Sequence, residues 1–228
     1  MEISEHIAAL RREGALLVQA AERGGPDAPV PPCPGWLMRD LVRHMGRVHR
    51  WATAYVRDGL GEPVSEEAQQ AVFGPMPDDA DLVPWAREAH SGLVGALESA
   101  KPDLECWTFL KAPSPLAFWA RRQAHETTIH RIDAETAAGG SLSPVPADLA
   151  VDGIDEPLAC FHTRSLSRVR TDNGPATLRI TATDADGDWL VRLSDEPPEV
   201  TRLTAGTTAG TAGGQAADRT PDCTLSGP

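Results

Sequence analysis

The chain has 228 residues, of which 41% are hydrophobic, so it is long enough to bury a core in one large domain or two small ones. Asp and Glu outnumber Lys and Arg by 33 to 21, and the formal net charge of -12 argues against nucleic acid or an anionic membrane as the main partner. No apolar run approaches the ~18 residues of a membrane span, so no membrane insertion is expected.

The start of the chain predicts a cytoplasmic protein. Its first residues, MEISEHIAALRREG, carry charges where a signal peptide would need an apolar stretch. The four cysteines are scattered, which favours reduced thiols over a disulfide framework or a zinc finger. They are Cys33, Cys106, Cys160 and Cys223. None has a neighbouring base in the sequence, so a nucleophilic cysteine is not expected.

Four helices are predicted in the first part of the chain. Apolar residues recur there at spacings of three and four, which is the pattern of one buried helix face. The predicted helices cover residues 3–23, 37–59, 79–100 and 114–138. The stretch PPCPGW separates the first two, and a long acidic connection, roughly residues 61–80, precedes the third. Four amphipathic helices of this length predict an antiparallel four-helix bundle, assigned to residues 1–140.

After the stretch GGSLSPVPADL the pattern changes. One short helix is predicted at about 147–160, and then ATLRITATD and DWLVRLSD alternate apolar and polar residues around the turn sequence DADGD. PEVTRLTA and the closing CTLSGP are candidate further strands, whereas residues 205–218 have the composition of a loop that a protease would cut first. Residues 145–228 are therefore predicted to form a small α+β domain that looks truncated, which makes the whole chain an α+β protein.

The fourth predicted helix carries an unusual pair of ionisable residues. Glu126 and His130 are four residues apart, so at ~100° per residue they lie one turn apart on one face. Side chains at this spacing can bind one metal ion, although a Glu and a His so placed more often form a surface ion pair. The pair alone is therefore weak evidence for a metal site.

The second predicted helix strengthens the case. Its apolar stripe consists of Leu37, Leu41, His44, Val48, Trp51 and Tyr55. His44 thus lies on the stripe expected to face the core, whereas His49 falls about 140° away and is expected at the edge or in solvent. An ionised Glu126 buried without a partner would cost several kcal/mol. A divalent cation held by His44, Glu126 and His130 would remove that cost, and two His with one Glu form a typical catalytic zinc set with an open position.

The two motifs together resemble a known family. PCPGWLMRDLVRHMGRVHRW followed by RRQAHETTIHRIDAE is similar to the mycothiol-dependent maleylpyruvate isomerase family, within the DinB-like metal-binding superfamily, which implies a DinB-like four-helix bundle. In that family a bundle histidine and a Glu-x-x-x-His pair bind the metal, roles that fall here on His44, Glu126 and His130. DGIDEPLACF, GPATLRITATDADGDWLVRL and LSGP resemble its smaller C-terminal domain, which is expected to continue past LSGP into a helix that this sequence lacks.

The resemblance implies a metal-dependent enzyme, with zinc or another divalent metal, that uses the small thiol mycothiol on a small electrophilic substrate. A free thiol is mostly protonated at neutral pH, whereas coordination to a metal makes it a nucleophilic thiolate. Addition of the thiolate to a double bond, rotation and expulsion would give cis–trans isomerisation, whereas retention of the adduct would give thiol S-transfer. The sequence leaves open these two reactions, the substrate, the metal and the oligomeric state.

Several residues near the motifs are candidates for supporting roles. Arg47 and Arg122 each lie within one turn of a predicted ligand, so either could hold a substrate carboxylate, because Arg suits bidentate binding. Asp133 could orient the His130 ring, and His125 could support the site. Surface ion pairs or structural roles compete with each of these assignments. Three tryptophans are expected to anchor the core, namely Trp36, Trp51 and Trp119.

Two other classes of function remain open. In the first, the bundle binds a metal only for stability and the C-terminal domain carries a small apolar ligand, which predicts a fourth metal ligand such as His125. In the second, the same open site activates water in a metal-dependent hydrolase, which would be active without any thiol. A helical bundle without metal is the simplest alternative.

Overall fold

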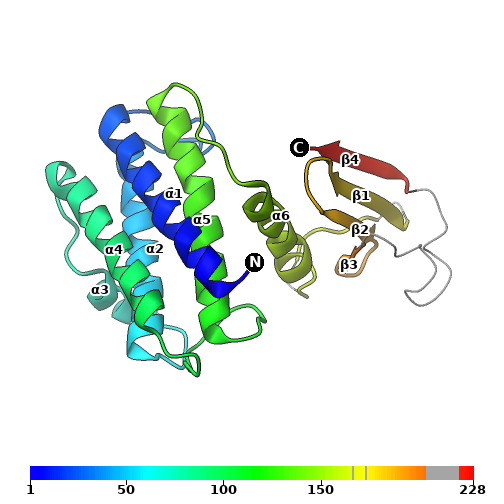
Figure 1. Cartoon of the computed structure of the whole chain (residues 1–228), viewed down its shortest axis with the longest axis horizontal. Coiled ribbons are helices and arrows are strands. Elements are labelled where there is room, and N and C mark those ends of the chain that lie inside the picture. Colours follow the sequence, from blue (N-terminus) through cyan, green and yellow to red (C-terminus); the bar gives the residue numbers. More distant parts are fainter. Residues whose placement is uncertain (166, 173, 204–220) are drawn as a thin grey trace. The chain divides into compact units, whose positions relative to one another are not determined.

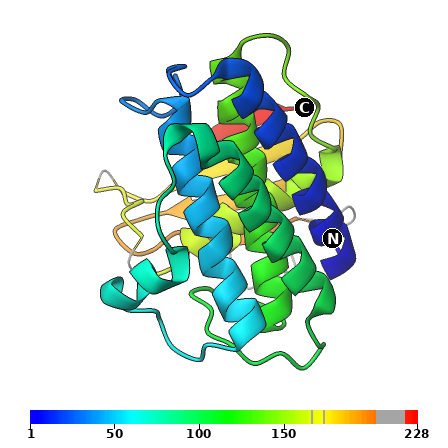
Figure 2. The same ribbon diagram turned by 90° about the vertical axis from the view of Figure 1, so that its left-hand side faces the viewer.

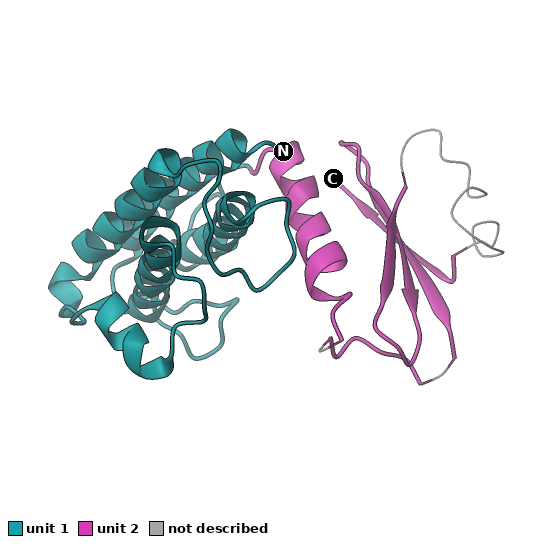
Figure 3. Cartoon of the chain, turned by 90° about the horizontal axis from the view of Figure 1, so that it is seen from below, with its two compact units in different colours: residues 1–144 teal, residues 145–228 magenta. Residues whose placement is uncertain are grey.

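The chain forms two compact units in the computed structural model, residues 1–144 and residues 145–228 (Figure 3). The structure describes residues 1–165, 167–172, 174–203 and 221–228. The loop predicted at 205–218 lies outside this described part. Among the described helices, none has the length and apolar character needed to cross a membrane.

Five α-helices build the first unit (Figure 1). They are α1 (Ile3–Gly24), α2 (Met38–Asp58), α3 (Glu66–Phe73), α4 (Leu82–Ser99) and α5 (Pro115–Ala138). Helix α5 has a strong start signal, because Ser114 accepts a hydrogen bond from the N–H of Ala117 and Pro115 occupies the first turn, where no N–H is needed. A short 3-10 helix, Asp79–Asp81, leads into α4.

The four long helices, α1, α2, α4 and α5, pack side by side, but not with the alternating directions of the predicted antiparallel bundle (Figures 1 and 2). Helices α2 and α4 run parallel, since Arg39 at the start of α2 pairs with Asp79 and Arg50 further along pairs with Glu88. Helices α1 and α5 also run in the same direction. The long connection between α2 and α4 makes this order possible, because it carries the chain back along the bundle before α4 begins.

The buried face of α2 is offset from the predicted stripe. His44, Val48 and Trp51 belong to that stripe, yet all three are only partly buried. The buried residues of the helix are Met38, Leu41, Val42, Met45, Gly46, His49, Ala52, Ala54, Tyr55 and Val56. Helix α2 packs against both α4 and α5, so it buries a wide face that includes His49. The same offset leaves His44 on the flank of the core.

Aromatic side chains fill the region where α2 ends and α5 begins. Trp119 is fully buried, its indole N–H donates to the carbonyl of Trp107 at 3.1 Å, and its ring stacks on Tyr55 with centroids 5.0 Å apart. Trp119 is therefore a core anchor, as predicted. Trp36 and Trp51 are only partly buried, but Trp36 packs against the buried core and Trp51 contacts the rings of Tyr55 and Trp119.

The second unit contains a helix and a four-stranded sheet in its described part. Its elements are α6 (Ala147–Asp155), a π-helical turn (Glu156–Phe161), β1 (Ala176–Ala182), β2 (Asp188–Leu193), β3 (Glu199–Arg202) and β4 (Cys223–Gly227). The strand order is β3-β2-β1-β4, and only β4 runs parallel to its neighbour. Trp189 on β2 is fully buried and donates to Asp155 of α6 at 2.9 Å. The predicted α+β class is confirmed.

Candidate functional site

Three side chains from two helices of the first unit converge on one point. His44 comes from α2, and Glu126 and His130 come from α5. Nε2 of His44 lies 3.3 Å from Oε1 of Glu126, and Nε2 of His130 lies 3.4 Å from the same oxygen. One ligand atom of each residue lies within 4.8 Å of the other two. The structure thus brings together the three residues that the sequence motifs single out, and this group is called the candidate centre below.

Helix geometry and helix packing together explain the meeting. Residues four apart on α5 share one face, and α2 packs beside that face. The rings of His44 and His130 meet edge to face with centroids 4.8 Å apart. Side-chain exposure is 34% for His44, 27% for Glu126 and 16% for His130, so the candidate centre is partly shielded but remains open to solvent.

The environment strongly favours a charged Glu126. Burial opposes its ionisation, but hydrogen bonds with His130 and His44 and the nearby charge of Arg122 hold the pKa of Glu126 far below its ordinary value. Burial also disfavours the charged form of His130, yet Glu126 and Asp133 raise the pKa of His130 above its ordinary value. Glu126 therefore draws protons onto the neighbouring imidazole, and a cation bound at this point would compete with them.

Two of the predicted supporting residues contact the candidate centre. Asp133 accepts a hydrogen bond from Nδ1 of His130 at 2.9 Å. Because an ionised carboxylate can only accept, Nδ1 carries the proton and Nε2 is the nitrogen that faces Glu126. Arg122 donates to Oε2 of Glu126 at 3.1 Å, and its side chain is 14% exposed. Each residue thus holds one side chain of the candidate centre in place.

The four other histidines of the first unit, His6, His49, His90 and His125, are buried. The ring of His125 is buried and meets His6 of α1 edge to face, with centroids 5.8 Å apart, and it is not part of the candidate centre. His49 is 2% exposed, so its predicted place at the edge or in solvent is wrong. Its Nε2 lies 2.9 Å from Oγ1 of Thr127. Burial, followed by the nearby His90, lowers the pKa of His49 to about 3, so His49 is neutral at physiological pH.

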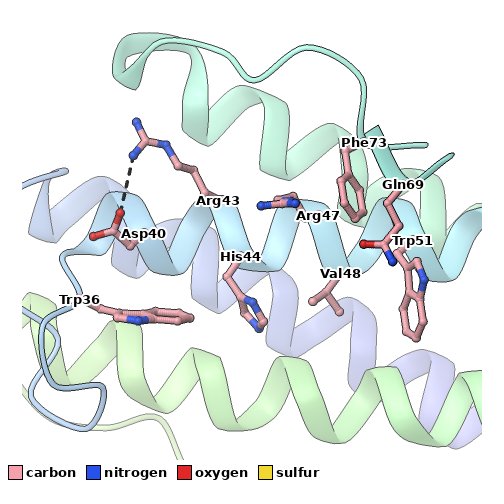
Figure 4. A pocket seen from close by; sticks show the side chains of 9 residues that line it. All are labelled: Trp36, Asp40, Arg43, His44, Arg47, Val48, Trp51, Gln69 and Phe73. Atoms are coloured by element: carbon pink, nitrogen blue, oxygen red, sulfur yellow. Dashed lines mark ion pairs between the residues drawn. The ribbon is translucent and has the colours of Figure 1, made fainter. Parts of the chain in front are cut away.

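A cavity of about 550 Å³ opens beside His44 (Figure 4). Its wall is formed by Trp36, Asp40, Arg43, His44, Arg47, Val48, Trp51, Gln69 and Phe73. The volume is typical of a site for a small molecule. Gln69 and Phe73 belong to α3, a helix in the connection that the sequence pattern predicts as a loop. The signal that could have revealed α3 is Ser65, which caps it by accepting from the N–H of Ala68.

The two arginines of the cavity wall have different partners. Arg43 is paired with Asp79 and Asp40. Arg47 lies over Phe73, with its guanidinium carbon 4.5 Å from the ring centroid. Within the described part of the chain Arg47 has no carboxylate partner. Its charge is therefore available to an anionic group that enters the cavity.

The donors of the candidate centre fit a divalent cation of the zinc type. Two imidazole nitrogens and one carboxylate oxygen are ligands that zinc prefers, and three protein ligands beside a cavity leave a position for another molecule. The two short distances to one oxygen of Glu126 show that the three groups already point at a common centre. No fourth His, Cys, Asp or Glu of the described residues joins this group, so a closed four-ligand site is not supported.

Fold and site together define a class of protein. The chain combines a helical bundle, an open set of two histidines and one glutamate beside a cavity, and a small α+β unit. The sequence profile described as the mycothiol maleylpyruvate isomerase N-terminal domain matches residues 7–135, which is more than half of the chain. The chain therefore belongs to the mycothiol maleylpyruvate isomerase family.

Two solved structures are similar to this chain in fold. A crystal structure of the mycothiol-dependent maleylpyruvate isomerase has a TM-score of 0.58, and one of a mutant with a histidine replaced by alanine has 0.57. Each is 14% identical to this chain and covers 86% of it, while the match covers 81% of the solved chain. At this identity the likeness shows a shared fold. No protein with a curated description matches the chain significantly.

Proposed function

We propose that this chain is a metal-dependent, mycothiol-using isomerase that acts on a small unsaturated electrophile such as maleylpyruvate. The observation that carries the proposal is the convergence of His44, Glu126 and His130 beside a cavity of about 550 Å³. Membership of the family supports the thiol and the reaction class, since the two similar crystal structures are described as a mycothiol-dependent maleylpyruvate isomerase.

In this proposal the candidate centre holds zinc or another divalent cation. When bound, such an ion would stabilise the thiolate form of a thiol at neutral pH, which is its nucleophilic form. Arg122 would fix the carboxylate of Glu126 through Oε2 and leave Oε1 to face the ion. Asp133 would keep the proton on Nδ1 of His130 and leave Nε2 to bind.

The cavity wall would orient the electrophile. Arg47 offers a guanidinium group to a substrate carboxylate, which it can bind through two parallel hydrogen bonds. Trp36, Trp51 and Phe73 would offer apolar surface to the rest of the substrate. Arg122 is not among the residues that line the cavity, and its bond to the carboxylate of the candidate centre favours a role there. Arg47 is therefore the proposed substrate-binding residue.

The cysteines support a cytoplasmic location for this proposed activity. All four are free thiols in the structure. Free thiols persist in reducing compartments, where a low-molecular-weight thiol is also available in its reduced form. We propose the cytoplasm as the compartment in which the enzyme works, with the small thiol and the electrophile as its partners.

Metal and thiol dependence test the proposal. The purified full chain is analysed for zinc, and mycothiol is then titrated into the zinc-loaded and the metal-free forms. We expect about one zinc per chain, thiol binding that requires the metal, and isomerisation of maleylpyruvate that requires both. A chain that binds no metal, or that isomerises without thiol, would reject the proposal.

The same assay separates the related activities. Accumulation of a stable thiol adduct of the substrate would identify the activity as thiol S-transfer and not as isomerisation. Hydrolysis by the zinc form without mycothiol would favour a hydrolase. The matched control is His162→Ala, because His162 belongs to no described group of three candidate metal ligands and its loss should leave zinc content unchanged.

A further inference from the structure

The turn that precedes α2 presents two side chains to the candidate centre. This turn, residues 31–36, is closed by hydrogen bonds from the N–H of Cys33 to the carbonyl of Val30 and from the N–H of Trp36 to the carbonyl of Cys33, each 3.0 Å long. Gly35 has a φ of 86°, which favours glycine over other residues. The prolines and the glycine therefore build a defined turn, in addition to separating two helices.

One of these side chains covers the imidazoles. The ring of Trp36 is nearly parallel to that of His130, at an interplanar angle of 16° with centroids 6.5 Å apart. Its centroid lies 5.3 Å from that of His44, and Figure 4 shows the indole beside His44 in the cavity wall. The turn thus restricts both histidines of the candidate centre from one side.

The second side chain reaches the carboxylate that orients His130. Sγ of Cys33 lies 3.6 Å from Oδ2 of Asp133, and the same oxygen accepts the 2.9 Å bond from Nδ1 of His130. Asp133 is 6% exposed, so its carboxylate depends on donors from the protein. Burial, followed by the charge of Asp133, raises the pKa of the Cys33 thiol, which therefore keeps the proton that it donates.

We propose that Cys33 is a positioning residue of the metal centre: its thiol holds Asp133 in the orientation that directs Nε2 of His130 at Glu126. This inference rests on the proposed function, because it takes the candidate centre to bind a metal. Partners that orient a metal-binding histidine change metal affinity by roughly 10–100-fold when they are lost. Cys33 acts on His130 only through Asp133, so its loss should change metal affinity by a factor at the lower end of that range.

The same neighbourhood allows a competing role for Cys33. One ligand atom each of Cys33, His130 and Asp133 lies within 4.8 Å of the others, so the three could themselves hold an ion. Positioning is favoured because Nδ1 of His130 is already hydrogen-bonded to Asp133 and because a ligand sulfur would have to lose its proton. The two roles predict different results for one pair of variants.

Zinc affinity of the full chain tests the positioning role. The dissociation constant is measured by competition with a chromophoric chelator for the wild type, Cys33→Ala and Cys33→Ser. We expect Cys33→Ala to weaken binding by about tenfold. Cys33→Ser should restore most of the affinity, because its hydroxyl can still donate to Asp133. Cys106→Ala, at another partly buried cysteine of the first unit, is the matched control and should bind as the wild type.

Cobalt substitution separates positioning from coordination. The cobalt-loaded wild type, without added thiol, should lack a near-ultraviolet thiolate-to-cobalt charge-transfer band. Such a band, lost in Cys33→Ser, would make Cys33 a ligand and overturn the inference. Equal zinc affinity of Cys33→Ala and the wild type would overturn it as well and leave the proposed function intact. A wild type that binds no zinc would reject the proposed function and this inference together.

Discussion

Helix α5 carries two clusters of ionisable side chains on different faces, and the two are organised in different ways. On one face Arg131 donates to Oε2 of Glu13 at 2.7 Å and to Oε2 of Glu135 at 2.9 Å, and these three residues are at most 3% exposed. On the other face lies the candidate centre, whose side chains are 16% to 34% exposed and of which His44 lines a cavity. The buried cluster is paired within the protein, whereas the candidate centre is open to another molecule.

The two clusters therefore serve different ends. The buried cluster also binds the chain that follows α5, since Arg131 donates to the carbonyl of Ser143 and Glu135 accepts from the N–H and the hydroxyl of Ser143. Its charges are used to join α1, α5 and this segment. At the candidate centre the carboxylate and two imidazoles converge, an arrangement that an added cation would satisfy, and His44 also lines the cavity. Charge alone does not mark a functional site, and openness to a cavity separates the two cases.

Loss of the central arginine should give the largest effect and should break the buried cluster only. Arg131→Met removes the buried cation between Glu13 and Glu135 and leaves them only Arg12 and Ser143 as partners, so we expect the free energy of unfolding to fall by about 3–5 kcal/mol. Urea denaturation of the metal-free chain measures the change. Zinc affinity of the remaining folded protein should not change, because Arg131 is not part of the candidate centre.

An exposed ion pair provides the control for this variant. Arg11 pairs with Glu98 on the surface, where both side chains are about half exposed. Arg11→Ala should therefore lower the free energy of unfolding by less than about 1 kcal/mol. A loss in Arg131→Met no larger than that in Arg11→Ala would show that the buried cluster does not stabilise the bundle.

Acid should destabilise the bundle through its buried histidines. In the unfolded chain His49 takes up a proton near pH 6.5, but in the folded chain only near pH 3, so below pH 6.5 the unfolded state binds more protons and stability falls. Between pH 6.5 and pH 4 this amounts to roughly 3 kcal/mol. The lowered pKa of His90 acts in the same direction, whereas the raised pKa of His130 acts in the opposite one.

A variant that cannot titrate isolates the contribution of His49. Glutamine does not titrate in this window, so the unfolding free energy of His49→Gln should depend less on pH, as measured by urea denaturation at successive pH values. The new side chain can still bond to Thr127 and so preserve the packing. His162→Gln, at a partly buried position in the second unit, is the control and should keep the wild-type profile. Identical profiles for His49→Gln and the wild type would contradict the assignment.

Removal of one proposed ligand should lower metal affinity and leave stability nearly unchanged, which is the reverse of the result expected for Arg131→Met. His44→Ala should weaken zinc binding by more than about 100-fold, since a direct ligand contributes more than the residues that orient it. The free energy of unfolding of the metal-free chain should change by less than about 1 kcal/mol, because the His44 side chain is 34% exposed. Zinc content of the purified variant measures the first effect, and urea denaturation followed by circular dichroism measures the second. Unchanged zinc content would refute the ligand assignment.

The smallest effect is expected at the cavity wall. Arg47→Gln should raise the KM for a carboxylate substrate by about tenfold and leave zinc affinity unchanged, because it removes a charge-assisted contact away from the metal ligands. Steady-state kinetics with excess zinc measures the change. The control is Arg50→Gln on the same helix, since Arg50 lies over Trp85 and does not line this cavity.

Arg122→Gln provides a second variant in which the effects on zinc affinity and on KM can be compared. Because Arg122 donates to Glu126 and does not line the cavity, Arg122→Gln should weaken zinc binding more than it raises KM. The reverse pattern would return Arg122 to the role of a substrate-binding residue. Parallel measurement of zinc affinity and KM in Arg47→Gln and Arg122→Gln distinguishes the two assignments.

Helices α1, α2 and α4 could be predicted because apolar residues repeat at helical spacing along each of them, whereas α5 is buried on several sides and has no single apolar face. The strong start of α5 at Ser114 and Pro115 adds a local signal that does not depend on packing. Helix α3 lacks such support, since Phe73 is the only buried residue among its eight. Without a repeated apolar face, the sequence of α3 does not distinguish a helix from an acidic loop.

Within one helix, the sequence by itself determined which side chains share a face, and this was enough to single out Glu126 and His130. The motif around His44 then indicated that a second helix supplies the third proposed ligand. The tertiary structure decided which side of α2 faces the core, and so buried His49 and left His44 beside a cavity. It also brought Cys33 to a carboxylate 100 residues away in the chain. Helical periodicity orders neighbours along one helix, whereas contacts between segments depend on how their surfaces pack.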